Sequence, residues 1–361
     1  MTPATFRLGS CTIHAGSGLI DRVGAIAREA VPAHRWAIIS DSNVAPLYAP
    51  RVSAGFGEVR TDVFTFPAGE AHKTRDEWAR LTDAMLATGF GRDGAVLALG
   101  GGVVGDVAGF VAATFMRGVP VVQVPTTLLA MIDASIGGKT GVDTAAGKNL
   151  VGAFHDPAAV IADPAVLTTL PERERRAGAA EAIKHGAIAD ANYCRRVTES
   201  LADALAAPAG DAMHHILTGS ISIKTAIVSG DARERGRRKV LNFGHTLGHA
   251  IEAASGYSLL HGEAIAIGMA LEAELAERLG VAAKGTAQAI RAAVESVSLP
   301  ARLPKGMDAD RVLALTRADK KSRAGVVEFA LPARIGSMAA EDKGWSIPVR
   351  DTDTRAVLTQ S

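Results

Sequence analysis

Short apolar runs alternate with helical patterns through the first half of the chain. Three runs end in polar or glycine-rich turns: "RWAIISD" (35–41), "GAVLALGGG" (94–102) and "VPVVQVPTT" (119–127). Between them, residues 74–90 and 103–118 place apolar side chains at the spacing of a helix. Runs that are apolar along their whole length are typical of strands buried on both faces of a sheet. The alternation therefore predicts an α/β domain with a mostly parallel sheet.

After about residue 165 the strand pattern nearly disappears. The segment "PERERRAGAAEAIKHGAIAD" (171–190) opens with Pro171, which suits the first turn of a helix. An apolar run at 325–332 predicts a strand or hairpin, and the polar tail 350–361 is expected to fray. Further helical patterns cover residues 210–230, 240–256, 262–279 and 284–297. We predict an α/β domain over 1–165 and a mainly α-helical domain over 166–361, with ligands bound in a cleft between them.

Composition narrows the class of protein. The 361 residues suffice for two domains, and 39 Lys plus Arg nearly balance 38 Asp plus Glu, so we expect no broad basic field for nucleic acid. Cys11 and Cys194 are too few for a disulfide framework, which favours a reducing cytoplasm. No apolar stretch reaches the roughly 18 residues of a membrane helix, and the N-terminus does not resemble a signal peptide. We expect a cytoplasmic protein without nucleic-acid or membrane partners.

A glycine turn follows the second predicted strand. Gly100, Gly102 and Gly105 stand in G-x-G-x-x-G register before a predicted helix, as in a Rossmann-like nucleotide site where backbone N–H groups approach a pyrophosphate. The alternative is a strand–helix turn that merely needs glycine. Asp41 and Asn43 end the preceding strand, where an acidic side chain is well placed to bind a ribose hydroxyl. Together these features favour a nucleotide site.

The stretch "NFGHTLGHAIE" (242–252) places His245, His249 and Glu252 near one face if it is helical. A metal site, a catalytic pair and a purely structural role all fit this spacing. The H-E-x-x-H motif of metal hydrolases is absent, because Thr246 follows His245.

Two further residues suggest a metal. Glu181 lies among small and apolar residues, where a buried carboxylate requires a cation or a metal, although an ion pair with Lys184 at i+3 is the simpler alternative. His261 directly precedes an apolar helix, whose N-terminus disfavours imidazolium, so we expect a neutral ring. One Glu and two His suit a catalytic zinc.

Basic residues recur beside glycine and polar turns. Each one singly is expected to be a solvated surface charge, whereas their convergence would bind a small polyanion such as a phosphate with a carboxylate. They are Arg117, Lys139, Lys148, Lys224, Arg238 and Lys320.

Taken together, these stretches resemble the 3-dehydroquinate synthase family of sugar-phosphate cyclases. The similarity covers nearly the whole chain, with the motifs in the family's order. They include "PAGEAHKT", "GGGVVGDVAGFVAATFMRG", "VPTTLLAMIDASIGGKTGVDTAAGKNLVGAF", "AEAIKHG", "DARERGRRKVLNFGHTLGHAIE", "LHGEAIAIGM" and "DKKSRAG". The resemblance implies a dehydroquinate synthase-like fold and a homodimer.

The resemblance also implies roles for individual residues. Glu181, His245 and His261 would hold zinc or cobalt. NAD would contact Asp41, Asn43, Glu70, Lys73, Gly101, Gly102, Asp106, Thr126, Thr127, Lys139, Lys148 and Thr169. The substrate would meet Asp133, Lys139, Asn149, Lys184, Lys224, Arg238, Asn242, His249, Lys320 or Lys321, and Arg117 from a partner subunit.

The implied reaction converts 3-deoxy-D-arabino-heptulosonate 7-phosphate to 3-dehydroquinate and phosphate, with NAD regenerated in each cycle. Another sugar-phosphate cyclase, a metal-dependent alcohol or glycerol dehydrogenase, and a non-catalytic nucleotide-binding module are the alternatives. The dehydrogenases typically carry an Asp and a third His where this chain has Glu181 and Lys184. That difference favours the cyclase.

Overall fold

The computed structural model describes residues 2–145, 147–318, 322–323 and 326–360. The chain forms two compact units, Met1–Leu170 with Pro208–Thr225, and Pro171–Ala207 with Ala226–Ser361. Helix α7 (Asp211–Ser229) begins in the first unit and ends in the second. The sequence pattern predicted a single change of domain near residue 165, and it carried no sign that a later segment returns to the first unit.

A seven-stranded sheet forms the centre of the first unit as far as it is described, in the order β1-β2-β9-β6-β5-β3-β4. The β1–β2 hairpin is antiparallel and the other neighbours pair in parallel. This confirms the mostly parallel sheet. The strands are β1 (Ala4–Leu8), β2 (Cys11–Ala15), β3 (Arg35–Asp41), β4 (Arg60–Phe66), β5 (Ala95–Gly100), β6 (Val121–Pro125) and β9 (Ala159–Ala162).

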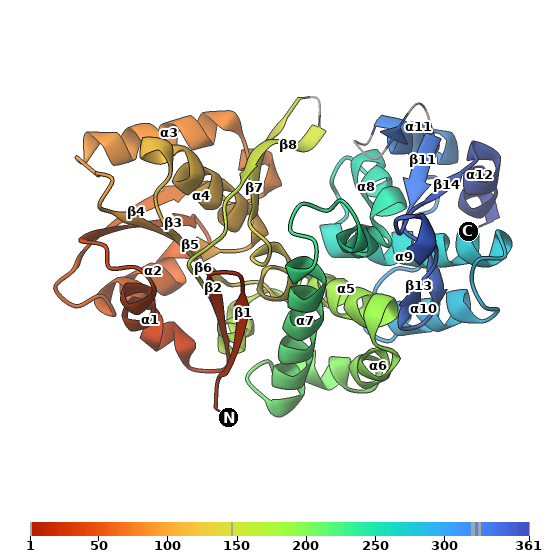
Figure 1. The fold of residues 1–361 in the computed structure, drawn as a ribbon, viewed down its shortest axis with the longest axis horizontal. Helices are drawn as coiled ribbons and strands as arrows, with labels where there is room; N and C mark the ends of the chain where they lie inside the picture. The colour runs from red at the N-terminus through yellow and green to blue at the C-terminus, as the bar shows by residue number, and fades with distance from the viewer. Residues whose placement is uncertain (1, 146, 319–321, 324–325, 361) are drawn as a thin grey trace. The chain divides into compact units, whose positions relative to one another are not determined.

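Helices cover both faces of this sheet, which explains why β3 and β5 are apolar along their length. Helices α3 (Arg75–Ala87) and α4 (Gly102–Thr114) lie on one face, and α1 (Val23–Ala30) and α2 (Ala45–Ala54) lie on the other (Figure 1). Alternate strand residues such as Ala37, Ile39, Val96 and Ala98 join the core under α3 and α4. Short helical turns complete the unit: η1 (Leu19–Arg22), η2 (Glu70–His72), η3 (Phe115–Arg117), η4 (Ala130–Ala134) and η5 (Pro164–Thr169).

A separate antiparallel hairpin, β7 (Lys139–Thr144) with β8 (Gly147–Phe154), also belongs to the first unit. It packs on α4 at a glycine: a Cβ added to Gly109 would lie 2.5 Å from Thr140 Cγ2. The apolar pattern of the sequence did not predict this hairpin. Its strands contain few buried apolar residues, and the apolar side chains of Leu150 and Phe154 are exposed.

The second unit is mainly helical, as the sequence predicts. Helices α8 (His245–Ala254) and α9 (His261–Arg278) approach so closely that a Cβ on Gly268 would lie 2.0 Å from the carbonyl oxygen of Gly244. Its helices, together with the end of α7, are α5 (Glu172–Ala189), α6 (Ala191–Ala206), η6 (Arg237–Asn242), α8 (His245–Ala254), α9 (His261–Arg278), α10 (Thr286–Glu295), α11 (Ala309–Ala318), η7 (Glu341–Lys343) and α12 (Asp351–Gln360).

Short strands also occur in the second unit, and the strand or hairpin expected at 325–332 is confirmed. The expectation of a frayed tail is wrong. Residues 351–360 form α12, and Thr354, Val357 and Leu358 share its buried face. The helix places these three residues on one face, although the segment as a whole is polar. Overall polarity therefore did not indicate a buried helix. The strands are β10 (Ser322–Arg323), β11 (Val326–Phe329), β12 (Pro332–Arg334), β13 (Ser337–Met338) and β14 (Ile347–Val349).

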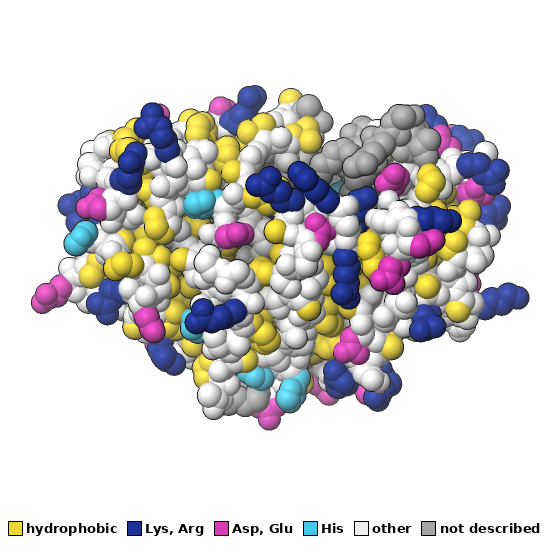
Figure 2. All heavy atoms as spheres, in the orientation of Figure 1, with side chains coloured by type: hydrophobic (Ala, Val, Ile, Leu, Met, Phe, Trp, Pro, Cys, Tyr) yellow, Lys and Arg dark blue, Asp and Glu magenta, His cyan; other side chains and the backbone are white. Residues whose placement is uncertain are grey.

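Two surface properties agree with the composition. On the face drawn in Figure 2, basic and acidic side chains are interspersed, in keeping with the near balance of charge. In the part of the chain that is described, no helix combines the length and apolar character needed to cross a membrane.

Candidate active site

The glycine turn joins β5 to α4, as predicted. A Cβ on Gly100 would lie 2.4 Å from Val104 Cγ2, and one on Gly105 would lie 2.9 Å from Gln123 Oε1, so packing accounts for both glycines. A Cβ on Gly102 would meet Ala134 Cβ at 3.5 Å, which is an ordinary contact. Packing therefore does not require glycine at position 102. Close approach of a phosphate to the N-terminus of α4 would give a reason for it.

Two threonines follow the neighbouring strand β6. Thr127 Oγ1 accepts a hydrogen bond from the Ala130 N–H at 3.2 Å and so has a local role in starting η4. Thr126 is buried, and its Oγ1 has no hydrogen-bond partner within the described residues. A buried hydroxyl without a partner is costly. Thr126 therefore fits a polar ligand at the carboxyl ends of β5 and β6.

Asp41, Asn43 and Thr169 have local partners. Asp41 Oδ1 accepts from the backbone N–H groups of Asn43 and Val44 at 2.8 and 2.9 Å, which closes the turn after β3. The Thr169 hydroxyl lies 2.7 Å from the Tyr48 hydroxyl. Local structure thus accounts for part of what these side chains do, and their contact with a nucleotide stays a prediction.

Lys73 is the centre of a buried polar cluster. Its ammonium donates to Asp106 Oδ2 and to Asn149 Oδ1, both at 2.5 Å, and Lys148 Nζ lies 3.1 Å from Glu70 Oε1. Burial lowers the pKa of the Lys73 ammonium, but the neighbouring carboxylates, Asp106 first among them, outweigh burial and leave that pKa raised. The structure thus brings together residues from three separate stretches of the chain: Glu70 and Lys73, Asp106, and Lys148 and Asn149.

Asn149 has a left-handed backbone conformation, with φ of 56°. Its N–H donates to Asp143 Oδ1 at 2.8 Å, and the Asp143 N–H donates to the Lys73 carbonyl at 2.7 Å. These bonds hold the conformation that points the Asn149 amide at Lys73. Sequence reasoning missed Asp143, although it lies inside the motif "GGKTGVDTAAGKN".

Three more predicted residues of the first unit differ in exposure, since Lys224 is buried whereas Lys139 and Arg117 are exposed. Lys224, buried on α7, donates to the backbone carbonyl and to Oδ1 of Asp133, both at 2.5 Å. Lys139 opens β7 and is exposed, and Arg117 is exposed with φ of 69°. Lys320 and its alternative Lys321 lie outside the described residues.

Three histidines converge in the second unit. His245 is the first residue of α8 and His261 is the first residue of α9. One ring nitrogen from each of His245, His249 and His261 lies within 4.8 Å of the others, and the His245 and His261 ring centroids are 5.5 Å apart. The helix predicted from "NFGHTLGHAIE" is confirmed. His249 comes as near to the group as the two predicted ligands do.

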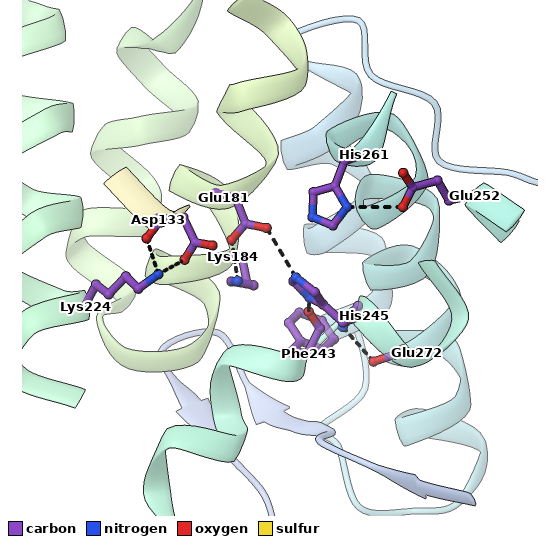
Figure 3. Close-up of polar contacts among 10 residues, drawn as sticks. Asp133, Glu181, Lys184, Lys224, Phe243, His245, Glu252, His261 and Glu272 are labelled. Carbon is purple, nitrogen blue, oxygen red and sulfur yellow. Dashed lines mark hydrogen bonds and ion pairs between the residues drawn. The ribbon is translucent and has the colours of Figure 1, made fainter. Parts of the chain in front are cut away.

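Glu181 lies fully buried on α5 next to this group (Figure 3). It forms an ion pair with Lys184, and His245 Nε2 lies 3.6 Å from Glu181 Oε1. Both kinds of partner considered for Glu181 from the sequence therefore lie next to it: Lys184, a cation on the same helix, and His245, a predicted metal ligand. The carboxylate faces the predicted ligand His245 as well as the predicted substrate contact Lys184.

The protein binds the second ring nitrogen of both predicted ligands. His245 Nδ1 lies 3.1 Å from the Phe243 carbonyl oxygen, and His261 Nδ1 lies 3.3 Å from Glu252 Oε2 (Figure 3). Such partners fix the tautomer and orientation of a histidine whose Nε2 binds a metal. Two imidazoles and a carboxylate suit zinc or cobalt. The residues present therefore fit a divalent metal.

A capping interaction fixes where α9 begins. Glu263 accepts a hydrogen bond from the Leu260 N–H at 2.8 Å and from Arg173 Nε at 2.7 Å. Burial raises the pKa of the Glu263 carboxyl, but these two partners outweigh burial and leave it lowered. His261 is thus held at the first helical position. Its neutral state, expected at a helix N-terminus, stays a prediction.

The predicted residues Arg238 and Asn242 are held by a turn that precedes α8. Arg238 is buried and donates to the Ala232 carbonyl at 2.5 Å, and the Asn242 amide donates to Glu234 Oε1 at 2.5 Å. Asp231 accepts from three backbone N–H groups of this turn, those of Arg235, Gly236 and Arg238. Sequence reasoning missed Asp231 and Glu234, although both lie in "DARERGRRKVLNFGH".

Comparison with solved structures defines the class of this fold. A structure of 2-deoxy-scyllo-inosose synthase with carbaglucose-6-phosphate, NAD+ and Co2+ matches with a TM-score of 0.91 and 27% identity over 100% of both chains. A 2-epi-5-epi-valiolone synthase from Streptomyces hygroscopicus, with NAD+ and Zn2+, matches at 0.86 and 28% over 100% of this chain and 99% of the other. A probable glycerol dehydrogenase from Sinorhizobium meliloti, at 0.69 and 17% over 98% and 97%, shares the fold alone. The fold is that of the cyclases.

Sequence comparison gives the family. Family models described as 3-dehydroquinate synthase N-terminal and C-terminal match residues 63–177 and 178–322. The 3-dehydroquinate synthase of Symbiobacterium thermophilum is 46% identical over 332 residues, 90% of this chain and 92% of the relative. That of Desulforamulus reducens is 41% identical over 97% of both. The chain belongs to the 3-dehydroquinate synthase family, which confirms the family and fold class expected from the sequence.

Proposed function

We propose that this protein is a 3-dehydroquinate synthase, a lyase that eliminates phosphate from 3-deoxy-D-arabino-heptulosonate 7-phosphate and closes the carbocycle of 3-dehydroquinate. The observation that carries the proposal is the group formed by Glu181, His245 and His261, in which each ring has its second nitrogen bound by the protein. Relatives of the same name that are 41–46% identical over nearly their whole length support this activity.

The proposed cofactors are NAD and a divalent metal, zinc or cobalt. When bound, NAD supplies a hydride acceptor that is regenerated within the cycle, and the metal supplies a Lewis acid for a substrate oxygen. Glu181, His245 and His261 would hold the metal. The turn at Gly102, which packing does not require to be glycine, and the Thr126 hydroxyl would take part in binding NAD. The two cyclase structures with NAD+ and Co2+ or Zn2+ support both cofactors.

The chain's own side chains would bind and orient the substrate. Lys139, Lys184, Lys224 and Arg238 are cations suited to its phosphate and carboxylate. Lys184 and Lys224 already lie against Glu181 and Asp133, so their ammonium groups are fixed before substrate arrives. A carboxylate beside such a lysine can also receive or return a proton. Asn149, Asn242 and His249 would complete the polar surroundings.

Product analysis tests the proposed activity. The purified protein with NAD, zinc or cobalt, and the heptulosonate phosphate is expected to release many phosphates per NAD, form dehydroquinate, and show no sustained NADH absorbance. NADH accumulation in step with product would instead indicate a dehydrogenase. Phosphate release from glucose 6-phosphate but not from the heptulosonate would indicate another cyclase.

We further propose a cytoplasmic homodimer in which Arg117 acts on the partner's substrate. Within its own unit Arg117 lies exposed in a turn where Met116, Arg117 and Gly118 all have positive φ, which directs it outward from the fold. Mixing two inactive variants, Arg117→Ala and Lys139→Ala, would restore activity in mixed dimers, because one site then has both native residues. Absence of any restoration in proven mixed dimers would contradict an Arg117 shared across subunits.

A further inference from the structure

Glu272 is a fully buried carboxylate on α9 that no predicted role includes. Its Oε2 accepts from the Gly244 N–H at 2.6 Å (Figure 3), and its Oε1 accepts from the Leu247 N–H at 3.0 Å. Both donors belong to the start of α8, where backbone N–H groups lack partners within the helix and carry partial positive charge. The two oxygens therefore hold the first turn of α8 on either side of His245.

The close packing of the two helices explains why this cap comes from α9. The residue before α8 is Gly244, with φ of 80°, and a Cβ there would lie 2.4 Å from Met269 Cγ. No side chain fits at the position from which an Asp or Ser would normally cap the helix. The same close approach of α8 to α9 brings the His245 and His261 rings within 5.5 Å.

Glu272, which caps α8, and the predicted metal ligand His261 lie on the same helix, α9. Glu272 follows His261 by eleven residues, which is about three helical turns, so both side chains leave the same face of α9. One helix thus supplies His261 from its first turn and, further along, the carboxylate that fixes the helix carrying His245. A rotation or slide of α8 would break one of the two hydrogen bonds to Glu272.

We propose that Glu272 is a positioning residue that sets the spacing of His245 and His261 for a divalent cation. The inference rests on the proposed metal site. Removing its charge should leave the histidines in the protein but loosen the geometry between them. Outer partners of metal ligands typically change affinity by about 10–100-fold when altered.

Cobalt titration of the full chain tests this role. Glu272→Gln is expected to bind Co2+ at least about tenfold more weakly than wild type and to shift its visible absorption bands, which report ligand geometry. The matched control is Asp163→Asn. Asp163 is also a buried carboxylate that accepts two backbone N–H groups, those of Ile20 and Ala165, but its unit contains none of the three histidines.

The outcomes separate this inference from the proposed function. Both variants are expected to lose thermal stability, and Glu272→Gln alone to lose cobalt affinity and alter the spectrum. If Glu272→Gln keeps the wild-type affinity and bands, Glu272 serves stability only and the inference is wrong. If wild type itself binds no cobalt, the metal site and the proposed function fail together. Should Glu272→Gln not fold, Glu272→Asp, which keeps the charge on a shorter arm, decides between the same outcomes.

Discussion

His245 and His261 each use one ring nitrogen within the protein, and the two partners differ in kind. Phe243 offers a neutral carbonyl to His245, whereas Glu252 offers a buried carboxylate to His261. A carboxylate raises the basicity of the imidazole it binds and fixes which nitrogen carries the proton. A single substitution can remove the Glu252 carboxylate that binds His261. It cannot remove the backbone carbonyl of Phe243 that binds His245.

Glu252→Gln is therefore expected to weaken zinc binding by about 10–100-fold while the protein stays folded. Competition with a chromophoric chelator measures the affinity. Glu277→Gln is the control, because Glu277 lies on α9, the helix that carries His261, but its carboxylate accepts a backbone N–H, that of Ala287, at 2.8 Å. Equal zinc affinity in wild type and Glu252→Gln would contradict the orienting role.

Asp231 provides a prediction about pH. Burial raises the pKa of its carboxyl, but hydrogen bonds from the Arg235, Gly236 and Arg238 N–H groups outweigh burial and leave the pKa below its usual value of 3.8. Because the folded pKa is the lower one, the carboxylate stabilises the turn above pH 3.8, and this stabilisation is lost as the pH falls through the folded pKa. Carboxyl carbon NMR should give a midpoint below 3.8. A midpoint at or above that value would contradict the hydrogen bonding described.

At the scale of elements, α4 shows two reasons for glycine in one helix. Gly109 faces Thr140 of the β7–β8 hairpin at a distance that excludes a methyl group, whereas Gly102 has room for one. The first glycine therefore serves packing. We propose that Gly102 leaves room for NAD to approach the N-terminus of α4.

Matched alanine substitutions separate these roles. Gly109→Ala is expected to lower the free energy of unfolding by about 1–3 kcal/mol, because the added methyl overlaps Thr140. Gly102→Ala should change it by no more than about 0.5 kcal/mol yet weaken NAD binding at least about tenfold. Calorimetry with and without NAD measures both quantities. Unchanged NAD affinity in a folded Gly102→Ala protein would place the nucleotide elsewhere.

Elements with strong apolar patterns were predicted closely. The run 35–41 coincides with β3, and residues 171–190 contain α5. The β7–β8 hairpin was missed because its strands lie on the surface of α4 and carry polar residues and glycine. Helix α12 was missed because it has few buried residues, too few to form a clear apolar period in the sequence. Their burial depends on packing against the core of the second unit.

At the scale of the whole molecule, the second unit has an apolar core of its own. Leu247 and Ile251 of α8 pack with Ile267 and Leu271 of α9 in that core. The helices that carry the histidines are therefore held together by side chains that touch no metal. The proposed metal would be catalytic in role rather than required for folding.

Chelation is accordingly expected to abolish turnover while the far-UV circular dichroism stays unchanged. The melting temperature should fall only by the mass-action contribution of the lost metal, and zinc or cobalt should restore activity. Full turnover in a preparation shown by elemental analysis to be metal-free would contradict the metal site. Loss of helical signal on chelation would contradict the catalytic rather than structural role.

The sequence predicted the members of the site better than their partners. Motifs matched to the family gave Lys73, Asp106, Asn149, His245 and His261, and the structure brings these together within their units. Of the carboxylates that hold them, Glu252 was placed on the histidine face of the predicted helix but without a partner, and Glu272 lies in none of the motifs. Their role arises from the packing of α8 on α9, which a linear pattern does not contain.

The path of the chain has a consequence for recombination between relatives. The two family matches meet at residues 177 and 178, inside α5, whereas the first unit also needs residues 208–225. A chimaera joined there would take Asp133 from one parent and Lys224, its partner within the same unit, from the other. We therefore do not expect the two matched segments, 63–177 and 178–322, to be interchangeable between relatives. We expect substitutions on the two sides of the junction, near Asp133 and Lys224, to be correlated among relatives.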